Sequence, residues 1–390
     1  MMKRIFFITS IFALSMVISV SAQQTEPSST AKMDPQAAIY YNKGIEYMKA
    51  GDFANAATSF DSSLQISKSA KTCLLKGQAL LKAQKMDEAI TAFKATIALD
   101  ANNDNAYYYL GDVNVTRKNY SEAIASYKKV LEITKTPSMK EEAEKSIALA
   151  QSNVAIEFYN KGNELVKANN FDEAVKNYDQ ALAISKDYKT YYQKGLTLRK
   201  ANKPEEAISA LNACIAVNDK FDLAYLALAG AQVTIKNYES AIGNYETALS
   251  LTENAERKVS IKEGMLTTYV ALGNSFLREK KYDKAIEIFK KATETSDLDQ
   301  AYLGLAKAYT EKKQNDLALA SLDKAAQFKK TVTDGGLAYY RGVIYMNRGD
   351  KAKAVENFTV GAKDPNFRKA CESQIAFMKA KENMDKQKKK

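Results

Sequence analysis

The chain of 390 residues contains no histidine and no tryptophan, and it has only five prolines and three cysteines. The missing histidine removes the commonest general base and one of the commonest metal ligands. With few prolines and 16 glycines, little in the composition interrupts helices. These absences favour a helical protein that carries no metal or cofactor and is not an enzyme.

Chemistry-bearing motifs are missing as well. The sequence has no phosphate-binding glycine loop, no nucleophile beside a suitable base, and no cysteine cluster with metal spacing. Paired acids such as Asp172 and Glu173 recur at one place in several predicted helices. They lie in the first turn, where carboxylates stabilise the helix dipole. We therefore expect no catalytic residues and no metal site.

Positive charge exceeds negative charge, with a formal net charge of +11. Basic residues alternate with acidic ones along the predicted helix faces, so the pattern argues against nucleic acid as a partner. Only the lysine-rich run at 386–390 is concentrated. We interpret it as the solvated end of a helix, with weak attraction to an anionic surface as the alternative.

The first 22 residues have the pattern of a signal peptide. Lys3 and Arg4 precede an apolar segment from Ile5 to Val20, and small residues end at Ala22. An uncleaved anchor is the alternative, although the apolar segment is short for a membrane span. We expect an exported chain without an integral membrane segment after cleavage, either periplasmic, envelope-associated or secreted. Residues 23–36 are predicted to be a flexible lead-in.

The rest of the chain is repetitive, with a helical period starting at Ala37. Each repeat has Gly or Ala at position eight, Ala at position twenty and a large apolar residue at position twenty-four, as in Gly162, Ala174 and Tyr178. This spacing predicts two helices that approach closely where one side chain is small and the other is large. The nine repeats begin at Ala37, Ala70, Asp104, Ala155, Tyr188, Asp222, Leu266, Asp299 and Gly335.

These residues resemble the tetratricopeptide repeat (TPR) family, whose units are about 34 residues long. The resemblance is to an exported bacterial member. It implies an all-α, right-handed α-solenoid of about nine helical hairpins in three triplets, with a C-terminal capping helix. Successive repeats begin 33 and then 34 residues apart in each of the first two triplets, which indicates that a three-hairpin block was duplicated.

The predicted organisation follows from these spacings. Repeats 1–3 span 37–137, repeats 4–6 span 155–255 and repeats 7–9 span 266–368. Residues 138–154 and 256–265 are predicted to be helical connectors, the first opening with a capping box of Ser138 and Glu141. Residues 369–390 form the capping helix and the lysine-rich tail.

The three cysteines, Cys73, Cys214 and Cys371, fall at packing positions of different repeats. Residues so far apart in a linear array do not meet, so we expect buried free thiols and no disulfide.

In the TPR family the first helices line a concave surface, with positions two, five, nine and twelve tending to face it. Position five is often tyrosine here, and tyrosines suit an extended peptide or a helix because they combine flat apolar area with a hydroxyl. The alternative is that they pack between hairpins. The predicted groove residues are Tyr41, Tyr108, Tyr159, Asn160, Asn163, Tyr192, Asn274 and Tyr339.

A basic stripe at position thirteen is the second candidate surface, and it would suit an acidic peptide or a C-terminal carboxylate. The alternative is structural, because a cation at the end of a helix stabilises it by roughly 0.3 to 1 kcal/mol. Its members are Lys49, Lys82, Lys167, Lys200 and Arg278.

The sequence thus predicts a non-catalytic protein-interaction scaffold of the cell envelope that binds a segment of an unidentified partner protein or peptide in its concave groove. The alternative is a structural or self-assembling envelope component, associated with a surface through its basic C-terminus. The oligomeric state is left open.

Overall fold

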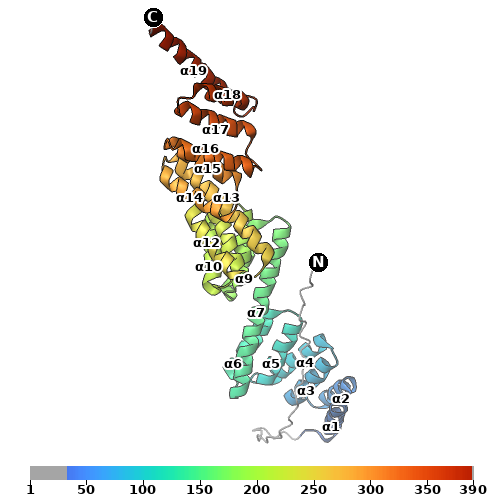
Figure 1. Ribbon diagram of the computed structural model, residues 1–390. Coiled ribbons are helices and arrows are strands. Elements are labelled where there is room, and N and C mark those ends of the chain that lie inside the picture. The colour runs from blue at the N-terminus through green and yellow to red at the C-terminus, as the bar shows by residue number, and fades with distance from the viewer. Residues whose placement is uncertain (1–32, 389–390) are drawn as a thin grey trace. The chain divides into compact units, whose positions relative to one another are not determined.

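The computed structural model describes residues 33–388, and in that range the chain forms 19 α-helices joined by short turns (Figure 1). The predicted signal peptide, most of the lead-in and the last two lysines lie outside the described residues. The chain divides into two compact units, an N-terminal unit of residues 1–147 and a C-terminal unit of residues 148–390. The second and third predicted blocks therefore share one unit.

The N-terminal unit contains repeats 1–3. Each first helix packs against its second helix, and each second helix packs against the first helix of the next repeat. The helices are α1 (Pro35–Ala50), α2 (Phe53–Ile66), α3 (Ala70–Lys82), α4 (Met86–Leu99), α5 (Asp104–Thr116) and α6 (Tyr120–Ile133).

Helix α7 (Pro137–Lys167) carries residues of both units and includes the predicted connector at 138–154. The C-terminal unit continues the alternating packing from α8 through α19, and α12 packs directly against α13. The helices are α8 (Phe171–Ile184), α9 (Tyr188–Lys200), α10 (Pro204–Val217), α11 (Asp222–Thr234), α12 (Tyr238–Leu251), α13 (Ala255–Arg278), α14 (Tyr282–Thr295), α15 (Asp299–Glu311), α16 (Asn315–Gln327), α17 (Asp334–Asn347), α18 (Lys351–Gly361) and α19 (Arg368–Lys388).

Two predicted boundaries were wrong. Helix α1 begins at Pro35, inside the expected lead-in, because the Asp34 side chain accepts hydrogen bonds from the N–H groups of Gln36 and Ala37. Pro35 at the first helical position has no N–H that needs a partner. The expected capping box also fails, since α7 begins at Pro137 and places Ser138 inside the first turn.

In the turn inside each hairpin, the residue at position fifteen of the repeat adopts a left-handed backbone conformation. Gly51 and Gly349 adopt φ of 77° and 80° there, and the other seven positions have φ between 58° and 62° without being glycine. Next to Gly51, the Asp52 N–H donates to the Tyr47 carbonyl at 2.9 Å and so satisfies a group at the helix end. The recurring turn gives every hairpin a similar entry into its second helix.

The core contains the predicted contact between a small residue at position eight and a large side chain at position twenty-four. A methyl group added at Gly77 would lie 2.5 Å from the Phe93 ring, and one at Gly162 would lie 2.6 Å from the Tyr178 ring. Ala174 and Tyr178 are fully buried. The prediction of hairpins closed by residues eight, twenty and twenty-four is confirmed.

The three thiols are free and buried, as predicted. Burial raises the pKa of Cys214 to about 11, which keeps this thiol protonated and unreactive.

Helix α19 covers the last hairpin with one face. Cys371 and Met378 are buried in a cluster with Phe358, whereas Phe377 and Met384 on another face are 61% and 57% exposed. The last few side chains of the lysine-rich tail lie outside the described residues. None of the helices described here is both long enough and apolar enough to span a membrane.

The close approach at position eight makes a stability prediction. Gly162→Ala forces a methyl group against the buried Tyr178 ring, so it should lower the free energy of unfolding by about 1 to 3 kcal/mol despite the better helix propensity of alanine. Denaturant titration followed by circular dichroism measures the change.

Gly243→Ala is the matched control, because Gly243 also lies inside a helix but has no atom within 4 Å of the added methyl group. It should stabilise by about 0.5 to 1 kcal/mol. If both variants change stability in the same direction, the packing account of position eight is wrong.

Candidate partner-binding surface

Four of the five position-five tyrosines contact the large ring at position twenty-four of their own hairpin. The ring centroids lie 6.0 Å apart for Tyr41 and Phe60, 5.5 Å for Tyr108 and Tyr127, 6.0 Å for Tyr159 and Tyr178, and 6.0 Å for Tyr339 and Phe358. All four tyrosines are only half-buried. One part of each ring therefore packs within its hairpin, and the remainder is open to a ligand.

Tyr192 has a different neighbour. Its ring lies edge-on to Phe221, which precedes α11 of the next repeat, with 5.1 Å between centroids. It is also half-buried, and burial raises the pKa of its hydroxyl. The tyrosine thus links adjacent hairpins while leaving part of its surface exposed.

In repeats 3 and 4, residue nine accepts a hydrogen bond from the tyrosine at position twenty-four. The Tyr178 hydroxyl donates to Asn163 Oδ1 at 2.8 Å, and the Tyr127 hydroxyl donates to Asp112 Oδ1 at 2.7 Å. Asn163 is therefore engaged within its own hairpin, while Asn160 is exposed. Repeat 7 has Phe289 at position twenty-four, so Asn274 at position nine receives no such hydroxyl.

Asp112 is a half-buried acid that forms no ion pair with any of the described residues. Burial raises its pKa to about 6, the hydrogen bond from Tyr127 opposes this shift, and the carboxylate of Glu142 adds to it. The folded chain binds this proton more tightly than the unfolded chain, so ionised Asp112 destabilises the N-terminal unit. Its stability should fall as the pH rises through about 6.

All five members of the basic stripe lie in the last turn of a first helix, at the ends of α1, α3, α7, α9 and α13. The Lys82 ammonium also lies 5.5 Å from the centroid of the Phe53 ring. A cation in this position stabilises the end of its helix through the helix dipole. Ligand binding by the stripe stays a prediction.

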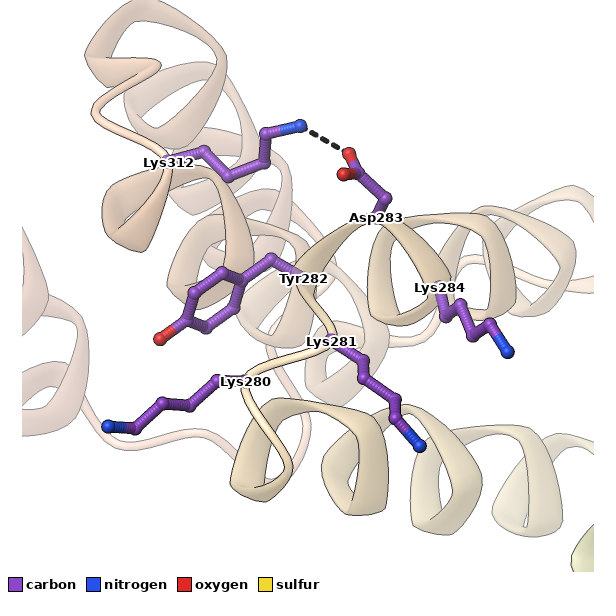
Figure 2. Close-up of a pocket in the computed structure, with 6 residues that line it drawn as sticks. All are labelled: Lys280, Lys281, Tyr282, Asp283, Lys284 and Lys312. Atoms are coloured by element: carbon purple, nitrogen blue, oxygen red, sulfur yellow. Dashed lines mark hydrogen bonds and ion pairs between the residues drawn. The ribbon is translucent and has the colours of Figure 1, made fainter.

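A basic hollow of about 290 Å³ lies at the turn between α13 and α14 (Figure 2). Lys312 reaches across to Asp283, whereas Lys280 points away from Lys281 and Lys284. The Lys281 ammonium pairs with Glu279 at 2.6 Å. One repeat later, Arg348 and Asp316 form the equivalent pair beside a similar hollow. A hollow of this kind therefore recurs at equivalent hairpin turns. Its charged side chains do not point toward a common centre.

A second hollow, of about 300 Å³, lies on the first helices α13, α15 and α17. Val270, Asn274, Gln300, Leu303 and Lys307 line it, and they occupy positions five and nine of repeat 7 and two, five and nine of repeat 8. These are the positions that the family pattern assigns to the ligand face. Of the predicted groove residues only Asn274 lies here.

The sequence prediction did not include Gln300 or Lys307, although they occupy positions two and nine, which tend to face the concave surface in this family. The predicted groove consisted of tyrosines at position five and of asparagines, so it left out Gln300 at position two and Lys307 at position nine. An alignment of position nine across repeats would have placed Lys307 beside Asn163 and Asn274.

The loop that closes this hollow is fixed by a buried carboxylate. Asp299 accepts hydrogen bonds from the backbone N–H groups of Lys330 at 2.7 Å, Thr331 at 2.5 Å and Val332 at 2.9 Å. These bonds lower the pKa of Asp299 even though its burial acts in the opposite direction. The loop between α16 and α17 is therefore held in one conformation against α15.

Residues 33–388 include no group of three or more acidic or cysteine side chains arranged to hold a metal ion.

The buried acid gives a pH-dependent prediction. Asp112→Asn keeps an oxygen acceptor for Tyr127, as Asn163 does for Tyr178, and removes the buried charge. At pH 8 it should stabilise α5 and α6 by about 1 to 2 kcal/mol, with little effect at pH 4. Hydrogen exchange of the buried amides in these helices measures the effect.

Asp87→Asn provides the control in the same unit, because the Asp87 side chain is 85% exposed and should show no comparable gain at pH 8. An equal gain for Asp112→Asn at both pH values would contradict a raised pKa as the cause.

Comparison with known proteins agrees with the hairpin architecture. Family models described as tetratricopeptide repeat match residues 37–69, 74–138, 158–188, 192–256 and 270–331. A DnaJ homolog subfamily C member 7 homolog from Dictyostelium discoideum is 27% identical over 272 residues, which are 68% of this chain and 48% of that protein. The chain thus spans about half the length of this relative.

Solved structures with helical repeats are also similar. The TPR domain of P58(IPK) is 15% identical, with 91% of this chain and 99% of that chain covered and a TM-score of 0.33. The TPR2AB domain of yeast Sti1, in a complex named with pHSP90, is 20% identical, with 60% and 98% covered and a TM-score of 0.31.

The family matches cover most of the chain, and the hairpins, turns and core contacts follow the same repeat. Stacked hairpins of this kind present an extended surface that suits the binding of other proteins. This chain belongs to the tetratricopeptide repeat family.

Proposed function

We propose that the chain is a non-catalytic scaffold of the cell envelope that holds a segment of a partner protein along its first helices. The observation that carries the proposal is the partial burial of the position-five tyrosines against neighbouring aromatic rings. Four of them pack on the core ring at position twenty-four and Tyr192 packs on Phe221, and all five are only half-buried. Such side chains lose little conformational entropy when a ligand covers them.

The C-terminal unit offers two adjacent anchors of this kind. Tyr159 packs on Tyr178 within repeat 4, and Tyr192 packs on Phe221 at the end of repeat 5, directly before α11. The exposed Asn160 carboxamide lies next to Tyr159 in the sequence of α7 and can hydrogen-bond to a peptide backbone. Aromatic rings flanked by an amide favour an extended segment or a helix as the ligand.

Self-assembly through α19 is the second candidate, and the exposed Phe377 and Met384 favour it. Phe377→Glu together with Met384→Glu changes only this exposed face and leaves Cys371 and Met378 buried. A fall in molar mass by light scattering would support assembly through α19. An unchanged mass would reject it.

The proposed envelope location depends on the N-terminal sequence, in which Lys3 and Arg4 precede the apolar segment that ends before Ala22. Expression in a bacterium with two membranes, followed by mass spectrometry of the purified chain, tests export and cleavage together. Gln23 is the expected first residue of the mature protein. A full-length cytoplasmic product would contradict this part of the proposal.

Partner capture tests the binding surface. A chain with both Tyr159→Ala and Tyr192→Ala should retain its helical circular dichroism and capture at least about tenfold less partner from envelope extract, because aromatic anchors dominate interface energies. Quantitative mass spectrometry of co-purified proteins provides the readout.

Tyr282→Ala is the control, since Tyr282 lies at the hairpin turn and its hydroxyl donates to Glu311 at 3.3 Å. It should capture as much partner as the parent chain. Equal capture by the double variant would overturn the proposed groove.

A further inference from the structure

Helix α19 has two apolar faces, and the last hairpin covers only one of them. Cys371, Ile375 and Met378 belong to the buried cluster of that hairpin. Phe377 and Met384 lie seven residues apart, which places them on another face, about 100° around the helix from Met378. Their side chains are 61% and 57% exposed. The second face therefore has no cover within the described part of the chain.

The C-terminal part of α19 extends beyond the last hairpin (Figure 1). Every described side chain after Met378, at 379–384, is exposed. So short a helical segment is only marginally stable in water when nothing packs against it. A surface that covers Phe377 and Met384 would therefore also stabilise this end of the helix.

The projecting segment is strongly basic. Residues 379–390 include six lysines and two acidic residues, which give a net charge of +4. Lys381 is exposed and lies four residues after Phe377 and three before Met384, the spacings that bring side chains onto one side of a helix. The uncovered face thus combines two large apolar side chains with a cation, and further lysines follow it in the sequence.

This combination fits the boundary between the headgroups and the acyl chains of a lipid bilayer. The aliphatic stem of Lys381 can lie along the apolar layer while its ammonium reaches anionic headgroups. The other lysines add attraction to an anionic leaflet without entering it. Binding of this kind requires only shallow burial of Phe377 and Met384.

A second copy of α19 is a poorer match for the same face. Two such segments side by side would bring two net charges of +4 together, and like charges repel each other. Two large apolar side chains per copy are also few beside the roughly 20 to 30 residues that each partner contributes to a stable interface. The charge of the segment therefore favours an anionic lipid surface over self-association.

We propose that the C-terminal part of α19 binds the surface of a membrane that contains anionic phospholipids. Phe377 and Met384 lie at the headgroup boundary, and the lysines of residues 379–390 face the headgroups. This function is additional to partner binding on the first helices and does not depend on the tyrosine groove. It would hold the last repeats next to a membrane.

Vesicle binding tests the need for anionic lipid. The chain of residues 23–390 contains all the described helices and lacks the apolar segment at 5–20, which could bind lipid by itself. We expect it to sediment with vesicles of equal parts phosphatidylglycerol and phosphatidylcholine. Binding to phosphatidylcholine alone should be at least about tenfold weaker, because lysines are attracted only to an anionic surface. Added salt should weaken binding to the anionic vesicles by screening.

Lys379→Gln together with Lys381→Gln should weaken binding to the anionic vesicles by about tenfold or more, because each lysine near such a surface contributes attraction. Lys262→Gln together with Lys290→Gln is the matched control. It removes the same charge from exposed positions on α13 and α14 and should bind like the parent chain.

A fluorescent probe tests whether the apolar face enters the lipid. The chain has no tryptophan, so Phe377→Trp places its only indole on this face. Its emission should move to shorter wavelength when anionic vesicles are added, and brominated lipids should quench it, because an indole in this position lies at the headgroup boundary. Tyr282→Trp, at the turn between α13 and α14, is the control and should show neither effect.

Equal binding to neutral and anionic vesicles, full binding by the chain with Lys379→Gln and Lys381→Gln, or unchanged Phe377→Trp emission on anionic vesicles would overturn the lipid site. An emission shift that follows protein concentration without vesicles would assign the face to a second copy and reject lipid. The chain with Tyr159→Ala and Tyr192→Ala should bind vesicles like the parent chain. A failure of the lipid site can therefore be told apart from a failure of the tyrosine groove.

Discussion

The contact between a small residue at position eight and a large side chain at position twenty-four is the interaction on which the other features of this chain depend. It sets how closely the two helices of a hairpin approach, since the space for even one methyl group is missing at Gly77 and Gly162. A single hairpin still leaves apolar faces uncovered, and neighbouring hairpins cover them. The outer positions of the first helices then become free to vary, because the core no longer depends on them.

The same contact decides which polar residues are available to a ligand. Where residue twenty-four is tyrosine and residue nine can accept, as in repeats 3 and 4, the hydroxyl takes residue nine as its acceptor, Tyr127 donating to Asp112 and Tyr178 to Asn163. Where it is phenylalanine, residue nine is released, as Asn274 is beside Phe289. The presence or absence of the tyrosine hydroxyl at position twenty-four therefore changes whether the polar side chain at position nine of the first helix is available to a ligand.

Different parts of the first-helix surface consequently have different chemical characters. The tyrosines at position five pack on aromatic rings and are half-exposed in both units, whereas in the third block the Lys307 ammonium has no ion-pair partner, and the Asn274 carboxamide no hydrogen-bond partner, among the described residues. Stacked hairpins with such varied surfaces suit the binding of other proteins.

The sequence by itself determined the fold, because the spacing of Gly, Ala and large side chains is a local pattern whose physical meaning does not depend on distant residues. Helices α3, α5, α9, α11 and α15 begin at the predicted first residues of their repeats, whereas α1, α7, α13, α17 and α19 begin one or two residues before the predicted starts. The tertiary structure decided the polar partners. Whether Asn163 or Asn274 is free, and whether a carboxylate reaches Lys307, depends on side chains brought together from different helices, and no local pattern records those distances.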